Sequence, residues 1–164
     1  MPSLNGWKAA PKFYDAWQNY TGANMDFICK DNPRPLIPEG IYEAVCISYD
    51  DGFCFGKCRK LFLTFKIITP GPHLGTELFM AFNMTYNGKI AAGSKYYKTW
   101  CMANEWQKPT RNAKMSPRIF KNKSYDVKVK TVKPQHNGAA MPEPFYYSVI
   151  ENILKVNTGT NSNG

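Results

Sequence analysis

The sequence lacks the features of membrane-spanning and secreted proteins. Among its 164 residues, no apolar run approaches the roughly 18 residues that a membrane-spanning helix needs. The N-terminus also lacks the basic segment followed by an apolar segment that marks a secretory signal. The five cysteines are an odd number, so without a signal we expect free thiols, a cytoplasmic location and no membrane partner.

Motifs of catalytic and metal sites are missing as well. The sequence contains no phosphate-binding loop, no G-x-S-x-G and no H-E-x-x-H. Cys54 and Cys58 form one close pair, but zinc sites commonly use two such pairs, and His73 and His136 are far apart in sequence. A Cys–His nucleophile built on Cys101 stays open, although no pattern points to it. We therefore expect a protein that is not an enzyme and that has no metal and no cofactor.

Acidic residues are scarce in the middle of the chain. Residues 52–133 carry 16 basic and 3 acidic side chains, whereas the segments on either side are slightly acidic. The formal net charge of +9 therefore arises from a central block with a net charge of +13. A positive charge concentrated in this way favours a polyanionic partner. A basic surface that only keeps the protein in solution is the simpler alternative.

What the sequence does contain is alternating apolar side chains, which indicate five β-strands. The strands are expected at residues 40–49, 60–68, 76–84 and 119–132 and from residue 145, and the end of the segment 145–156 could instead turn helical. A turn is expected at Asp50, Asp51 and Gly52, after the first strand. The Pro-rich residues 31–40 separate these strands from an N-terminal extension.

One helix is expected over residues 94–108, with Ser94 as its N-cap. Tyr96, Trp100 and Trp106 are expected to pack into the core. The element order then matches the mainly β OB-fold, a five-stranded barrel with one helix between strands 3 and 4. An unrelated α+β sheet is the alternative. We expect an N-terminal extension over residues 1–35, an OB-fold nucleic-acid-binding domain over 36–156 and a disordered tail over 157–164.

The stretch "GFCFGKCRKLFLTF" (52–65) combines aromatic and basic side chains at the place where an OB-fold binds its ligands. Aromatic rings on the outer side of a sheet can stack on the bases of a single strand, and cations can contact its phosphates. The rings expected to stack are Phe53, Phe55, Phe62 and Phe79; the cations expected to contact phosphates are Lys57, Arg59, Lys60, Lys66, Arg111, Lys114, Arg118, Lys128 and Lys130.

Each of these residues also has a simpler interpretation. The N-terminal extension or a second subunit could cover Phe62 and Phe79. Phe53 and Phe55 could pack against each other within their loop. The basic residues between 108 and 125 could belong to a solvated connector without any ligand.

Four stretches carry a resemblance to a known family: "IPEGIYEAVCISY", "RKLFLTFKIITPG", "LGTELFMAFNM" and "KNKSYDVKVKTV". Over residues 38–156 the chain resembles the OB-fold single-stranded DNA-binding proteins of phages and mobile elements. The resemblance implies a protein that coats single-stranded DNA during replication or recombination, with little sequence preference and often as an oligomer. The terminal "NTGTNSNG" lacks the acidic, Phe-tipped tail by which many bacterial members recruit partners.

Two other functions remain open at this point. An RNA-binding OB module would use the same residues, because the choice between RNA and DNA depends on how the site treats the 2′-hydroxyl. A protein-interaction domain would instead use the exposed aromatic rings as an interface.

Overall fold

The computed structural model describes residue 29, residues 31–54 and residues 58–158. The chain divides into two units, Met1–Pro33 and Arg34–Gly164, and every element discussed below belongs to the second. Most of the expected N-terminal extension and residues 159–164 of the expected tail therefore lie outside the described residues. No helix in the described part of the chain has the length and apolar character needed to cross a membrane.

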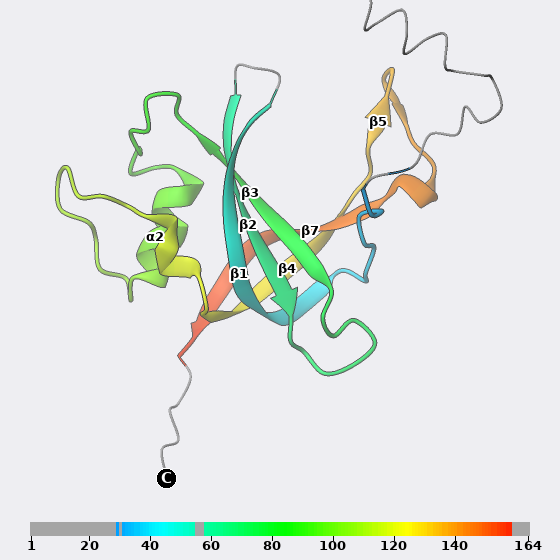
Figure 1. The fold of residues 1–164 in the computed structure, drawn as a ribbon, viewed down its shortest axis with the longest axis horizontal. Coiled ribbons are helices and arrows are strands. Elements are labelled where there is room, and N and C mark those ends of the chain that lie inside the picture. Colours follow the sequence, from blue (N-terminus) through cyan, green and yellow to red (C-terminus); the bar gives the residue numbers. More distant parts are fainter. Residues whose placement is uncertain (1–28, 30, 55–57, 159–164) are drawn as a thin grey trace, which may run out of the picture. The chain divides into compact units, whose positions relative to one another are not determined.

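Five strands form one antiparallel sheet (Figure 1). They are β1 (Gly40–Cys54), β2 (Cys58–Ile67), β3 (Glu77–Met84), β4 (Ser124–Val132) and β7 (Tyr147–Asn157), in the order β3-β2-β1-β4-β7. The long strand β1 pairs with β4 through its first half and with β2 through most of its length. A register shift between Cys46 and Ser48 marks a bulge in β1, and such a bulge bends a strand.

The two edge strands of the sheet, β3 and β7, pack against each other. No hydrogen-bonded pairing joins them in the described residues, so the sheet is not closed into a barrel. The structure thus confirms the predicted mainly β fold, with a five-stranded antiparallel sheet and a helix between its third and fourth strands. It does not confirm the barrel.

The core lies on the inner face of the sheet, where the alternation along each strand predicted it. Leu61, Leu63, Phe65 and Ile67 of β2 are buried, as are Leu78, Met80 and Phe82 of β3 and Tyr125, Val127 and Val129 of β4. Helix α2 (Lys95–Ala103) begins at Ser94, whose side chain accepts a hydrogen bond of 3.1 Å from the amide of Tyr97. This N-cap confirms the predicted start of the helix.

The helix ends earlier than predicted, at Ala103 instead of residue 108. The amide of Trp106 donates to the carbonyl of Cys101 over 2.8 Å, and Glu105 and Trp106 both have positive φ angles, of 55° and 61°. This arrangement closes a helix with left-handed residues. It turns Trp106 outward, with 68% of its surface exposed, so its predicted place in the core is wrong.

The turn predicted at Asp50–Gly52 is also wrong, because β1 continues to Cys54. Asp51 pairs with Leu61 and Phe53 with Arg59. The backbone pairing between β1 and β2 therefore includes the polar residues that were expected to turn. Residues 52–59, which the prediction left between the first two strands, are therefore mostly strand in the described part of the segment. At the other end of the sheet, β4 begins only at Ser124, after the 3₁₀ helix η2 (Pro117–Phe120), and β7 stays extended to Asn157 without turning helical.

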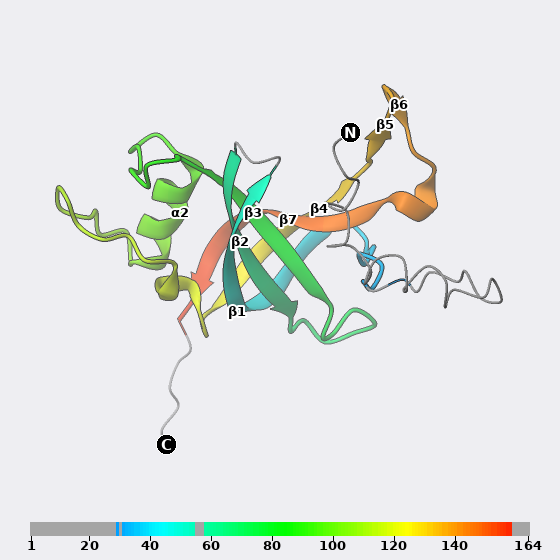
Figure 2. The same cartoon turned by 45° about the horizontal axis from the view of Figure 1, so that its top comes forward.

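A small second hairpin lies between residues 133 and 144, where the prediction had no strand. It consists of β5 (Gln135–His136) and β6 (Ala139–Ala140) and is followed by the 3₁₀ helix η3 (Glu143–Phe145). Asn137 and Gly138 join its strands with φ angles of 51° and 79°, the geometry that Asn-Gly favours in tight hairpins. In both views this hairpin and the β1–β2 hairpin extend toward the top of the picture (Figures 1 and 2).

Candidate functional site

Two aromatic rings meet on the outer face of β2 and β3. Alternation along β2 places Phe62 on this face together with Lys60, Thr64 and Lys66, as the sequence predicted. Phe79 of β3 reaches the ring of Phe62 with 5.8 Å between ring centroids, in an edge-to-face arrangement. Both rings are half-buried, so neither is hidden in the core and neither is fully covered.

A third ring extends this pair across the open edge of the sheet. Tyr147, the first residue of β7, stacks on Phe79 with 6.3 Å between ring centroids and 28° between ring planes. We call Phe62, Phe79 and Tyr147 the aromatic row. Sequence reasoning missed Tyr147, since Tyr146 and Tyr147 are adjacent and the sequence does not show which one faces β3.

Arg34 lies over two rings of the aromatic row. Its guanidinium carbon is 4.6 Å from the ring centre of Tyr147 and 5.4 Å from that of Phe79. The segment that carries it is held beside β7, because the amide of Ser148 donates to the carbonyl of Pro35 and its hydroxyl accepts from the amide of Ile37, both over 2.8 Å. Such a cation–π contact at an exposed site contributes about 0.5–1 kcal/mol. Sequence reasoning missed Arg34 because it assigned this residue to the extension.

The charge around the aromatic row is nearly balanced. Arg34, Lys60 and Lys66 are positive, while Asp50 and Glu77 occupy facing positions on β1 and β3. Residues that face each other across two strands share one side of a sheet. The large positive charge of the central block is therefore not concentrated on this face.

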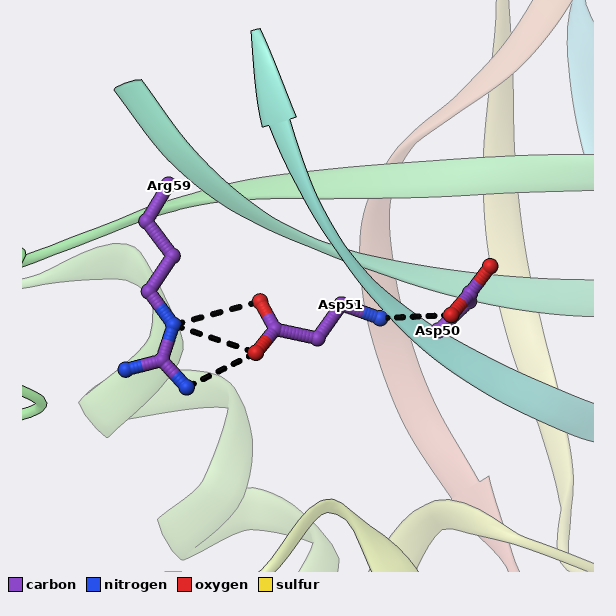
Figure 3. A network of polar contacts seen from close by, with 3 residues as sticks. All are labelled: Asp50, Asp51 and Arg59. Atoms are coloured by element: carbon purple, nitrogen blue, oxygen red, sulfur yellow. Dashed lines mark hydrogen bonds and ion pairs between the residues drawn. The ribbon is translucent and has the colours of Figure 1, made fainter. Parts of the chain in front are cut away.

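Arg59 lies on the opposite side of β2 from Lys60 and Phe62. It forms a two-point ion pair with Asp51, in which Nη2 is 2.7 Å and Nε 3.1 Å from Oδ2 (Figure 3). Asp50 supports the pair, since its Oδ1 accepts a 2.9 Å hydrogen bond from the amide of Asp51. The hydrogen bond from Arg59 lowers the pKa of Asp51, and the same bond raises the pKa of Arg59. The structure thus separates Arg59 from the other cations predicted on β2.

Arg59 instead faces a cleft of about 1000 Å³. The predicted cations Arg111 and Lys114 line the same cleft, and Lys89 adds a fourth positive charge that sequence reasoning did not select. We call this hollow the basic cleft. Its walls come from β1, β2 and β3, from the loop between β3 and α2, from α2 and from residues 109–117. Arg118 is exposed on η2 and is not among the lining residues.

Lys128 and Lys130 point outward from β4, as predicted, but their charge is partly offset. Both contact the carboxylate of Glu151 on β7, over 3.0 and 3.7 Å. Lys95 of α2 donates to the backbone carbonyl of Glu151, so three lysines surround one acid. The hydrogen bond from Lys128 lowers the pKa of Glu151. Exposed pairs of this kind contribute little to stability.

The remaining predicted residues are Phe53, Phe55 and Lys57, which come between or at the ends of β1 and β2 in the sequence. Phe53 pairs with Arg59 through its backbone, and its side chain is not among those described. Phe55 and Lys57 lie outside the described residues. Their predicted role in binding therefore stays a prediction.

The cysteines do not form a metal site in the described residues. Cys29, Cys46, Cys58 and Cys101 are free, and no three His, Cys, Asp or Glu side chains there are close enough to hold a metal ion. Burial raises the pKa of Cys46 to about 11, so its thiol stays protonated. Cys101 is buried in the core, and His73 lies edge-on against Tyr42.

Comparison with known families finds no family model that matches the chain, and comparison with curated proteins finds no significant match. The resemblance to single-stranded DNA-binding proteins therefore stays a prediction.

Proposed function

We propose that this protein binds single-stranded nucleic acid on the aromatic row and that DNA is its main ligand. The observation that carries the proposal is the row itself, in which three half-buried rings from three strands lie side by side and two of them lie beneath Arg34. Every base has a flat face, and stacking on an aromatic side chain contributes roughly 1–3 kcal/mol per base. Because all four bases stack, the binding would show little sequence preference.

The strand order supports an OB-type architecture as part of this proposal. An OB-fold is a partly open five-stranded barrel that binds its ligands on strands two and three and on the loops after strands one and four. Here β2 and β3 carry Phe62 and Phe79, and the β1–β2 and β5–β6 hairpins take the places of those two loops. The edges of β3 and β7, packed but not paired, would be the open part of the barrel.

In the proposed role the protein coats single-stranded DNA in the cytoplasm during replication or recombination, as the resemblance to phage and mobile-element proteins implies. The near balance of charge around the row fits a binder that depends on stacking more than on phosphate contacts. RNA remains an alternative ligand, because the rings would stack on its bases equally well.

A protein-interaction role is the second candidate, and exposed apolar side chains support it. Ile41 on β1, Phe145 on η3 and Leu154 on β7 are 66%, 54% and 44% exposed. Contacts through these side chains would allow a homo-oligomer, which is also compatible with coating a strand.

Fluorescence anisotropy with a labelled oligonucleotide of about 30 nucleotides, long enough for several sites, tests the proposal. We expect the protein to bind single-stranded DNA more tightly than the duplex of the same sequence, and matched RNA in competition decides between the two ligands. Equal binding to duplex, or no binding at about 50 mM salt, would contradict the proposal. An Ile41→Ser variant that loses oligomerisation and keeps its affinity for the oligonucleotide would favour the interaction role.

A further inference from the structure

The basic cleft lies on the other side of β2 from the aromatic row, and its residues suit a ligand of their own. We propose that it is a second binding site, which takes one phosphate-bearing nucleotide unit, either as a free nucleotide or as the phosphorylated end of a strand. The inference does not rest on the proposed function, because none of the aromatic-row residues lines the cleft.

The charge in the cleft calls for an anion. Arg59, Lys89, Arg111 and Lys114 face it, and Asp51 is the one acidic residue among its lining. The carboxylate of Asp51 neutralises the charge of Arg59. The other three cations have no ion-pair partner among the described residues. Phosphate groups carry negative charge and several acceptor oxygens, so they are suited to such a cluster.

Arg59 is held in place before any ligand arrives. Its Nε and Nη2 donate hydrogen bonds to Asp51 (Figure 3). These bonds fix the orientation of the guanidinium and of its remaining donors. Its Nη1 lies 3.5 Å from the position that a Cβ on Gly88 would occupy, so the guanidinium reaches the turn after β3. A guanidinium fixed in this way loses little conformational freedom when it binds an anion.

The loop with Arg111 and Lys114 is also anchored. The hydroxyl of Tyr96 donates to the carbonyl of Met115 over 2.7 Å, and the indole Nε1 of Trp100 donates to the carbonyl of Ser116 over 3.1 Å. Both donors are buried residues of α2, so they tie the end of the loop to the core. The cleft is therefore formed by the fold and does not depend on a ligand to assemble it.

The remaining walls suit the flat, weakly polar part of a nucleotide. Tyr97, Met84, Ile90 and Met115 line the cleft between the cations. Small-molecule sites typically combine an apolar lining with a few charged groups, in volumes of about 300–1,000 Å³. A cleft of about 1000 Å³ is large enough for a nucleotide with its phosphate. An inorganic anion alone would leave the apolar walls without a partner.

Isothermal titration calorimetry of the full chain with AMP, adenosine and inorganic phosphate tests the inference. We expect AMP to bind more tightly than either of its two parts. The double variant Arg111→Ala/Lys114→Ala should lose about tenfold or more in affinity for AMP, because charge-assisted hydrogen bonds are lost. The matched control Lys98→Ala/Lys155→Ala removes the same charge from exposed positions outside the cleft and should bind AMP as the wild type does.

A second arm compares an oligonucleotide with a 5′-phosphate against the same strand with a 5′-hydroxyl. A preference for the 5′-phosphate that the double variant abolishes would identify the strand end as the source of the nucleotide. Phe79→Leu should leave the binding of AMP unchanged, so this variant separates the cleft from the aromatic row. The inference is overturned if neither AMP nor the 5′-phosphate binds in a way that depends on Arg111 and Lys114. It is also overturned if an oligoglutamate peptide displaces AMP as well as a nucleotide does.

Discussion

Phe79 and Tyr147 lie face to face across the two edge strands of the sheet, with 6.3 Å between their ring centroids. No hydrogen-bonded pairing joins β3 and β7 in the described residues, so this stack, with Arg34 above it, is a specific side-chain link between them. The same two side chains therefore link the edge strands and form the centre of the proposed binding face.

Replacing Phe79 with Leu keeps an apolar side chain at this position but removes the flat ring. We expect the affinity for single-stranded DNA to fall about 5- to 150-fold, which corresponds to the loss of roughly 1–3 kcal/mol of stacking. Trp106→Leu is the control, because Trp106 is an exposed ring on the loop after α2. Fluorescence anisotropy measures both variants, and an equal loss in the control would argue against a specific role for the row.

Arg34 can be tested through the salt dependence of binding. For single strands, each neutralised phosphate contributes about −0.7 to the slope of log affinity against log salt. With Arg34, Lys60 and Lys66 as the phosphate contacts, we expect a slope of about −2, and Arg34→Ala should make it less steep by about 0.7. Arg34→Lys should keep the slope of the wild type. A slope near −5 in the wild type would mean that the four cations of the basic cleft also contact the strand.

Much of the sheet could be predicted from the sequence, because the alternation along β2, β3 and β4 is a local pattern. The inward positions of Leu63, Met80 and Val127 follow from it directly. The aromatic row could be predicted only in part, since the place of Tyr147 depends on which edge strands approach each other. That is a property of the folded sheet and not of any one segment.

Local sequence signals gave wrong predictions where the backbone conformation depends on pairing with a distant strand or on how a helix ends. Asp50, Asp51 and Gly52 have turn propensity, but the ladder to β2 keeps them extended. Trp106 continues the helical spacing, but the left-handed residues after Ala103 turn it outward. The basic cleft was missed for a related reason, because its cations come from three separate segments and converge only in the fold.

The ion pair between Asp51 and Arg59 predicts a dependence of stability on pH. Since the pKa of Asp51 in the folded protein is lowered below its usual 3.8, the pair stabilises the fold above that pH. This contribution is lost as the pH falls through the lowered pKa. We expect Asp51→Asn to unfold at a slightly lower urea concentration than the wild type at pH 6, and the difference to shrink below pH 3.8.

The control for this measurement is Glu143→Gln, which neutralises an exposed acid outside the three ion pairs of the described residues. Its unfolding midpoint should stay close to that of the wild type at both pH values. A difference for Asp51→Asn that grows as the pH falls would contradict the assigned role of the pair.

The two tryptophans on either side of the helix end should respond differently to substitution. Trp100 is buried, and its Nε1 donates to the carbonyl of Ser116 over 3.1 Å. We expect Trp100→Phe to lower the free energy of unfolding by about 1–3 kcal/mol, because it leaves this carbonyl without its partner and a gap in the core. Trp106→Phe should change it by less than about 0.5 kcal/mol, as an exposed substitution does. Urea unfolding of both variants checks the prediction, and equal losses would mean that Trp106 packs into the core after all.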